Sequence, residues 1–210
     1  MSKLTKERGA QIREEYSGIK EKMVCDKHNL TQIGGSRTKV DGTDGVSNKS
    51  IKNASGSSTQ VHLTTQNHFI KSLNLDSNST EFIRLFCGNK EMNNGGKDRF
   101  TISQIDSKIV DSFKTFLNDN KLSVIDLIIR NGFDITHVIF NDIKGNKEYE
   151  LTYEEIIQKV SDSTEWVFMK GGIHLKNKEG KTYFHFQREG KKNPNNRYNV
   201  LWHIHKHLFN

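Results

Sequence analysis

VDGTDGVSNKSIK, residues 40–52, joins two short predicted strands. The first strand is expected over residues 37–40. Residues 50–52, Ser-Ile-Lys, then alternate as a second strand does, with the isoleucine facing one way and its neighbours the other. Between the strands, residues 41–45 are Asp-Gly-Thr-Asp-Gly, a run rich in residues that favour turns. The sequence therefore predicts two adjoining strands that bring an aspartate and a lysine together.

Asp41 and Lys52 have the chemistry that phosphodiester hydrolysis requires. A carboxylate can bind Mg²⁺ through its oxygens, and an ammonium group can orient the attacking water and offset charge on the phosphate. An Asp-Gly turn also occurs between strands for conformational reasons alone, because both residues suit turns. Lys49, the polar loop over residues 53–59 and the Thr-Thr-Gln-Asn of residues 64–67 add groups that commonly bind phosphates, which favours the catalytic interpretation.

The pair resembles the motif of the PD-(D/E)xK nucleases, the superfamily of most type II restriction endonucleases. Val40-Asp41 is similar to the first half, with Val in place of Pro, and Ser50-Ile51-Lys52 to the second half, with Ser50 in place of Glu or Asp. The resemblance covers roughly residues 10–70. It implies a restriction-endonuclease-like fold, a Mg²⁺ site at Asp41, a catalytic role for Lys52 and a place for Ser50 in the catalytic motif.

The serine at position 50 means that a second acidic metal ligand must come from elsewhere. Residues 53–75 contain no Asp or Glu. The remaining candidates are an acid in the turn, two acids on the first predicted helix and two uncharged glutamines: Asp44, Glu14, Glu15, Gln60 and Gln66. We expect Asp44 and Glu15 to complete the metal site with Asp41.

Apolar periodicity divides the rest of the chain into helices and strands. Helices are expected over residues 4–28, 66–74, 80–88, 103–117, 122–131 and 152–161, the last opened by a capping box of Thr152 and Glu155. Strands are expected over 138–140, 166–169, 172–175 and 182–187, with loops at 53–59 and 89–98. Residues 60–65 fit either a strand edge or a helix start, and residues 198–208 a last strand or short helix. The predicted fold class is α/β or α+β, one nuclease domain over residues 1–210 with a mixed central β-sheet flanked by helices.

Positive charge is concentrated at the two ends of the chain, and the net charge is +7. Residues 1–60 carry 11 Lys and Arg against 7 Asp and Glu, residues 61–164 carry 12 against 15, and residues 165–210 carry 9 against 3. A polyanionic partner would therefore be attracted to the ends, which are the catalytic-motif region, residues 1–75, and a basic hairpin, residues 165–210.

The basic hairpin is the predicted DNA-reading element. Gln187 and Arg188 end a predicted strand, and Gln and Arg are the side chains that pair with adenine and guanine edges in the major groove. Lys191, Lys192 and Arg197 follow and are expected to contact phosphates. A solvated basic hairpin is the alternative interpretation. Residues 189–191, Glu-Gly-Lys, form a second Glu-x-Lys pattern, but no Asp ends the strand before it.

His203, His205 and His207 alternate near the C-terminus, and three imidazoles on one strand face would suit Zn²⁺. No fourth ligand of matching spacing follows, so phosphate contact or an ordinary surface strand is the preferred interpretation. Cys25 and Cys87 do not form a metal-binding pair and are expected to be reduced thiols.

The sequence has no apolar run long enough for a membrane span, and charges occupy the N-terminal stretch where a signal peptide would be apolar. We therefore expect a protein of the prokaryotic cytoplasm. The leading hypothesis is a Mg²⁺-dependent, site-specific endonuclease that cuts double-stranded DNA as a homodimer, because a palindromic site mirrors two-fold symmetry. The resemblance also implies a cognate DNA methyltransferase. The alternatives are a non-catalytic nucleic-acid-binding protein and a repair or RNA-processing nuclease.

Overall fold

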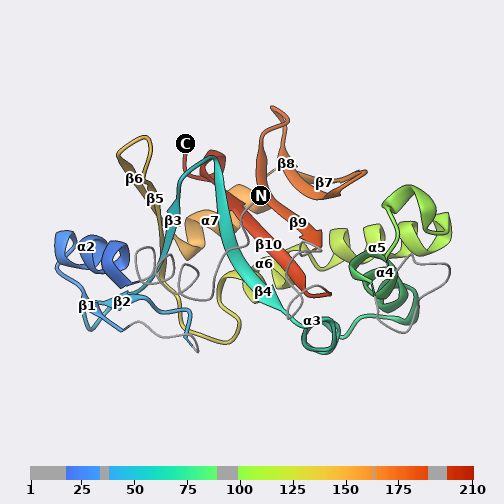
Figure 1. Cartoon of the computed structure of the whole chain (residues 1–210), viewed down its shortest axis with the longest axis horizontal. Helices are drawn as coiled ribbons and strands as arrows, with labels where there is room; N and C mark the ends of the chain where they lie inside the picture. Colours follow the sequence, from blue (N-terminus) through green and yellow to red (C-terminus); the bar gives the residue numbers. More distant parts are fainter. Residues whose placement is uncertain (1–17, 34–37, 89–98, 163, 189–197) are drawn as a thin grey trace, which may run out of the picture.

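The computed structural model describes residues 18–33, 38–88, 99–162, 164–188 and 198–210. Within these ranges the chain forms two five-stranded sheets and six α-helices (Figure 1). The first sheet has the order β1 (Thr31–Gln32), β2 (Gly42–Thr43), β3 (Asn48–Ala54), β5 (His137–Asp142) and β6 (Lys147–Thr152). The second has the order β4 (Ser58–Thr64), β10 (Val200–His205), β9 (Thr182–Arg188), β8 (Gly172–Asn177) and β7 (Thr164–Met169). The pair β3 and β5 is parallel, and the other described pairs are antiparallel.

The helices are α2 (Lys20–Lys27), α3 (Gln66–Leu73), α4 (Ser77–Cys87), α5 (Ser107–Asp119), α6 (Lys121–Ile129) and α7 (Tyr153–Ser161), with 3₁₀ turns η2 (Ile102–Gln104) and η3 (Lys206–Leu208). In the view of Figure 1, α6 and α7 lie behind the second sheet. Each helix in the described part of the chain is too short or too polar to span a lipid bilayer.

The main core lies between the second sheet and the helices. Strand β10 shows how the sequence builds it: Val200, Trp202 and Ile204 are fully buried, while His203 and His205 face the other way. Such alternation is expected of a strand with one face on the core. Trp202 stacks on the Phe186 ring of β9, which fixes the neighbouring strand against the same core.

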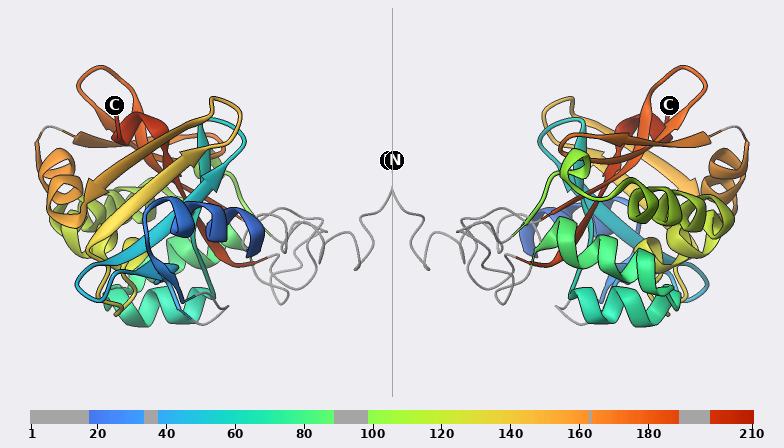
Figure 2. Two further views of the ribbon diagram at one scale, coloured as in Figure 1. Left: turned by 90° about the vertical axis from the view of Figure 1, so that its left-hand side faces the viewer. Right: turned by 90° about the vertical axis from the view of Figure 1, so that its right-hand side faces the viewer.

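A second, smaller core holds α2 against the first sheet. It consists of five buried residues that do not belong to the main core: Val24, Cys25, Leu30, Ile51 and Ile139. Figure 2 (left) shows α2 crossing the strands of this sheet. The chain then leaves β3 and enters β4, so one continuous segment links the α2 region to the second sheet.

The predicted fold class is confirmed, since the structure is a mixed α/β arrangement with helices around β-sheets. The capping box at Thr152 and Glu155 is also confirmed, because each residue's side chain bonds the backbone N–H of the other. The strands, however, are divided between two sheets. The strand expected over 37–40 is wrong for its described part, residues 38–40: the first hydrogen bond to β3 comes from the N–H of Asp41, and the two-residue β2 begins at Gly42.

Other boundaries shifted for identifiable reasons. Helix α4 begins at Ser77 because Asp76 caps it, its carboxylate accepting from the N–H of Ser79 at 2.8 Å. The loop expected over residues 53–59 is shorter, since β3 continues to Ala54 and β4 starts at Ser58. Strand β6, an edge strand, was not predicted; none of its residues is fully buried, but Tyr149 and Leu151 are partly buried against the main core.

Candidate active site

The carboxylate of Asp41 lies where the chain enters β2, and it contacts β3. Its Oδ2 accepts hydrogen bonds from the backbone N–H of Ile51 at 2.6 Å and from the Ser50 hydroxyl at 3.4 Å. Nζ of Lys52 forms an ion pair with the same oxygen at 3.4 Å. The side chains of Lys52 and Asp41 are only 15% and 14% exposed. The structure therefore brings together the three residues of the predicted motif in a partly desolvated site, where charges interact more strongly than in water.

The hairpin of β2 and β3 places these groups. The N–H of Asp41 donates to the carbonyl of Lys49 at 2.9 Å, so the ladder begins at Asp41 itself. Asp44 closes the turn, its Oδ1 accepting from the N–H groups of Val46 at 2.9 Å and Ser47 at 2.6 Å. These bonds lower the pKa of Asp44, the bond from Ser47 having the largest effect. In this structure Asp44 is a fully exposed turn residue whose Oδ1 is engaged by the backbone.

Gly42, directly after Asp41, is needed because α2 packs closely on the hairpin. A Cβ at this position would lie 2.8 Å from Sγ of Cys25 and 3.2 Å from Leu30. We expect Gly42→Ala to lower the free energy of unfolding by about 1–3 kcal/mol through overpacking. Gly56→Ala is the matched control, because a Cβ there meets nothing within 4 Å. Urea unfolding of both variants checks this, and equal midpoints would contradict the close packing.

Glu21 is a carboxylate of the site that the sequence interpretation missed. Burial has the largest effect on its pKa and, together with the Asp41 carboxylate, raises that pKa to about 7 against the opposing effect of Lys52. The half-buried Glu21 therefore interacts electrostatically with both charges of the site. The sequence predicts that an acid of the first helix, Glu15, reaches the site, and Glu15 lies outside the described residues. Glu21 is on the same predicted helix, and its position relative to Asp41 depends on where α2 packs.

The donor set of Asp41 and Glu21 fits Mg²⁺. All three contacts of the Asp41 carboxylate end on Oδ2, and no hydrogen bond within the described part of the chain reaches Oδ1. Burial and, to a lesser extent, the negative charge of Asp41 disfavour the ionised form of Glu21, and a divalent cation would stabilise it. Among the described residues, no group of three or more His, Cys, Asp and Glu forms a metal site. Two carboxylates are nevertheless enough for Mg²⁺, which retains several waters.

Lys39 is a second lysine near the site. Its Nζ donates to the carbonyl oxygens of Val61, at 3.2 Å, and Ile128. Burial, followed by repulsion from Lys52, lowers the pKa of Lys39 to about 6. At neutral pH Lys39 is therefore mostly uncharged, and its contacts tie the segment before Asp41 to β4 and α6.

The predicted DNA-reading residues lie on the second sheet. Nε2 of Gln187 is 3.1 Å from Nε2 of His203. Arg188 is half-buried: its Nη1 donates to the carbonyl of Phe100 at 2.8 Å, and its guanidinium lies 5.5 Å from the ring centroid of Phe86. Lys191, Lys192 and Arg197 lie outside the described residues, as does the second Glu-x-Lys pattern at 189–191.

The two glutamines that could replace the missing acid, Gln60 and Gln66, form no hydrogen bond with the candidate site in the described part of the chain. Gln66 donates through Nε2 to the carbonyls of Gly88 at 2.7 Å and Tyr198 at 2.8 Å, which links α3 to the ends of α4 and β10. Gln60 is an exposed residue of β4. No hydrogen bond between either glutamine and Asp41 is present among the described residues.

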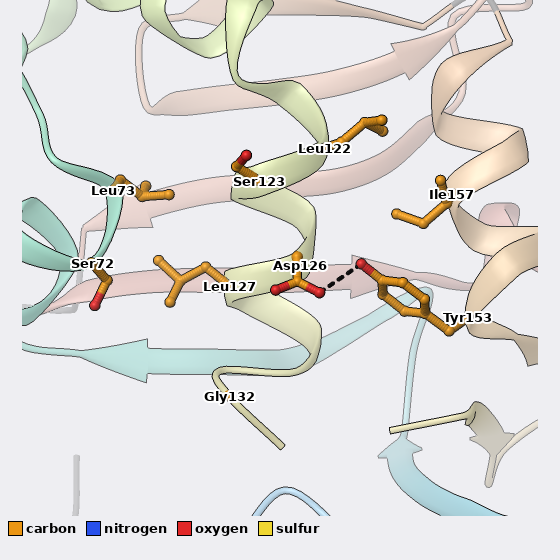
Figure 3. A pocket seen from close by; sticks show the side chains of 9 residues that line it. All are labelled: Ser72, Leu73, Leu122, Ser123, Asp126, Leu127, Gly132, Tyr153 and Ile157. Atoms are coloured by element: carbon orange, nitrogen blue, oxygen red, sulfur yellow. Dashed lines mark hydrogen bonds between the residues drawn. The ribbon is translucent and has the colours of Figure 1, made fainter. Parts of the chain in front are cut away.

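A surface hollow of about 490 Å³ lies between α3, α6 and α7 (Figure 3). Asp126 lies in it and accepts a 2.7 Å hydrogen bond from the hydroxyl of Tyr153. The guanidinium of Arg130 stacks on the Tyr153 ring, 3.4 Å from its centroid. The residues that line this hollow do not include Asp41, Ser50 or Lys52, so it is separate from the candidate active site.

Comparison with known proteins gives a structural likeness but no sequence match. No protein-family model matches the chain, and no curated protein sequence matches it significantly. Among solved structures, the chain is similar to the restriction endonuclease MspI in complex with its cognate DNA. The two share 9% sequence identity with a TM-score of 0.48, over 83% of this chain and 69% of the MspI chain. The assignment of Asp41, Ser50 and Lys52 rests on their own contacts.

Proposed function

We propose that the chain is a Mg²⁺-dependent, site-specific endodeoxyribonuclease of the type II restriction kind. The observation that carries the proposal is the Asp41 carboxylate held 3.4 Å from the Lys52 ammonium, with both side chains largely buried. A protein that only binds nucleic acid gains nothing from acidic groups beside a lysine, because they repel phosphate. A hydrolase needs both kinds of group.

The residues of the site have different proposed roles in hydrolysis. Asp41 and Glu21 would hold Mg²⁺, which supplies Lewis-acid stabilisation of the phosphate and a more acidic water when bound. The N–H of Ile51 fixes the Asp41 carboxylate through Oδ2, which leaves Oδ1 to face a ligand. The Lys52 ammonium orients the attacking water and offsets the negative charge that develops on the phosphate. Ser50 contributes a hydroxyl 3.4 Å from Asp41 in place of the usual acid.

The substrate we propose is double-stranded DNA. The net charge of +7 favours a polyanion, and the surplus lies at the two ends of the chain, one of which carries the candidate site. We propose that two copies act as a homodimer on a palindromic sequence, and that a cognate methyltransferase protects the host DNA, as in other restriction systems.

Incubating the purified chain with supercoiled plasmid and Mg²⁺ tests the function. We expect discrete fragments that disappear when a chelator removes the metal. A smear would indicate a nuclease without sequence specificity, and cleavage of structured RNA in place of DNA would indicate an RNA-processing enzyme. DNA binding without any cleavage, with or without Mg²⁺, would indicate a non-catalytic nucleic-acid-binding protein.

The proposed readout by the basic hairpin gives a further prediction. Arg188→Ala should weaken binding to the cognate site by about 1–3 kcal/mol and change binding to random DNA little, because a base contact is lost. Lys191→Ala or Lys192→Ala should weaken binding to both DNAs alike and reduce the salt slope by about one unit. Gln187→Ala should resemble Arg188→Ala, and Arg197→Ala should resemble the lysine variants.

Affinities for cognate and random DNA across a salt series separate these outcomes. Arg188 also holds the carbonyl of Phe100, so the melting temperature of Arg188→Ala must be measured in parallel. Equal losses on both DNAs in a folded Arg188→Ala variant would show that the arginine has a structural role and that specificity lies elsewhere.

A further inference from the structure

Four histidines lie together on the face of the second sheet that points away from the main core. His174, His185 and His203 are paired across β8, β9 and β10. The His185 ring stacks between the other two, with ring centroids 5.2 Å from His174 and 4.6 Å from His203. Of the three alternating histidines near the C-terminus, His205 shares this face with His203, while His207 lies in η3.

His205 approaches His185 from the side. The two rings are inclined at 60°, and Nε2 of His205 lies 2.7 Å from Nδ1 of His185. One of these nitrogens must carry the proton of this hydrogen bond and the other must offer its lone pair. Burial lowers the pKa of His205 to about 3 and also lowers that of His185. The neutral imidazole is the form in which histidine binds metals.

We propose that His185 and His205 are the protein ligands of a site for a borderline divalent metal ion such as Zn²⁺ or Cu²⁺, bound through Nδ1 of His185 and Nε2 of His205. A tetrahedral ion with Zn–N distances of about 2.0–2.1 Å needs its two nitrogens roughly 3.3 Å apart. The observed 2.7 Å must widen by less than about 1 Å, which small ring rotations can supply. The ring that donates the hydrogen bond changes tautomer on metal binding: its proton moves, through exchange with solvent, to its other nitrogen. Metal binding therefore releases no proton.

The surroundings of the pair hold it ready for an ion. The stacked rings of His174 and His203 keep the His185 ring in one plane, so less side-chain freedom is lost on binding. Gln187 in turn contacts His203 at 3.1 Å. No group of three or more His, Cys, Asp and Glu side chains among the described residues could hold a metal ion. Water must therefore complete the coordination, and the bound ion should be exchangeable.

This site would differ in selectivity from the carboxylate pair Asp41 and Glu21. Imidazole ligands suit Zn²⁺, Cu²⁺ and Ni²⁺, whereas carboxylates and water suit Mg²⁺. Excess Mg²⁺ should therefore occupy the carboxylates and leave the imidazoles open. The inference does not depend on nuclease activity, because it concerns a different sheet and a different class of ligand.

The test uses the full chain without an affinity tag, stripped of metal and kept in excess Mg²⁺. Calorimetric titration with ZnCl₂ should show one equivalent bound, and the electron paramagnetic resonance spectrum of the Cu²⁺ form should show coupling to two imidazole nitrogens. His185→Asn and His205→Asn should each weaken Zn²⁺ binding by at least about tenfold, since loss of even an outer-shell partner has an effect of that size.

Two matched variants serve as controls. His207→Asn removes a nearby histidine outside the pair, and His174→Phe keeps a stacking ring without a nitrogen donor. Both should retain Zn²⁺ binding within a few-fold. Absence of binding to the unmodified chain, a Cu²⁺ spectrum with fewer than two nitrogens, or undiminished binding in the folded His185→Asn and His205→Asn variants would each overturn the proposal. The Cu²⁺ spectrum of the unmodified chain decides the matter even where a variant fails to fold.

Discussion

Asp41→Ala and Lys52→Ala should each lower the rate of DNA cleavage by about a hundredfold to a thousandfold while the fold is retained. The Asp41→Ala variant lacks the carboxylate that would bind Mg²⁺, and the Lys52→Ala variant lacks the ammonium that would stabilise the transition state. A single preorganised electrostatic contact of this kind contributes about 10²–10³ in rate. Single-turnover cleavage of a cognate fragment measures the effect, with circular dichroism to confirm folding.

Lys49→Ala is the matched control for Lys52→Ala. Lys49 is on the same strand and is similarly buried, but it pairs with Glu150 on β6 at 2.6 Å. Its loss should leave cleavage within a few-fold of the unmodified chain. Asp41→Ala should also abolish the tightening of DNA binding by divalent metal, which Lys52→Ala should retain. A near-normal cleavage rate in either Asp41→Ala or Lys52→Ala would show that the active site lies elsewhere.

Glu21→Gln should have the second largest effect, a loss of about a hundredfold or more in cleavage at limiting Mg²⁺, because a metal ligand is removed without a change of shape. Asp44→Asn, in contrast, should have little effect, since Asp44 is exposed and its Oδ1 is occupied by turn backbone. The two variants distinguish the helix carboxylate from the turn carboxylate. A severe loss in Asp44→Asn together with normal activity in Glu21→Gln would reverse this assignment.

The pKa of Glu21 adds a pH dependence with a definite sign. Its pKa is raised to about 7, so the carboxylate is increasingly protonated as the pH falls below 7, and a protonated carboxyl group is a poor ligand. The Mg²⁺ concentration that supports half-maximal cleavage should therefore rise as the pH is lowered from 8 to 6. Glu21→Gln should remove this part of the pH dependence. An unchanged Mg²⁺ requirement over this range would contradict a ligand role for Glu21.

The hairpin of the candidate site could be predicted from the sequence because its information is local. The alternation at 50–52 specifies the second strand, and short spacing brings Asp41 close to Lys52, although the first strand lies at 42–43, within the predicted turn. The helix caps at Thr152 and Asp76 are similarly local, although only the first was recognised. Apolar residues alone misplaced the start of α4, because a capping aspartate precedes the apolar stripe.

Glu21 could not be identified from the sequence, because its position depends on long-range packing. The first helix carries several acids, and which of them meets Asp41 depends on how Val24 and Cys25 pack against Ile51 and Ile139. The same is true of the histidine cluster: alternation placed His203 and His205 on one face, but only the pairing of β8, β9 and β10 adds His174 and His185. Strand β6 carried a usable signal, since Tyr149 and Leu151 alternate with charged residues.

The separate small core beneath α2 gives this helix a weaker attachment than the strands of the second sheet have. Within the described part of the chain, five buried residues attach the helix that carries Glu21, whereas the second sheet shares a much larger core. Regions with few buried contacts open at lower free energy than the whole molecule. Amide hydrogens of α2 should therefore exchange with solvent well before those of β10. Moderate heating should abolish cleavage reversibly at a temperature at which the fluorescence of Trp202 still indicates an intact main core.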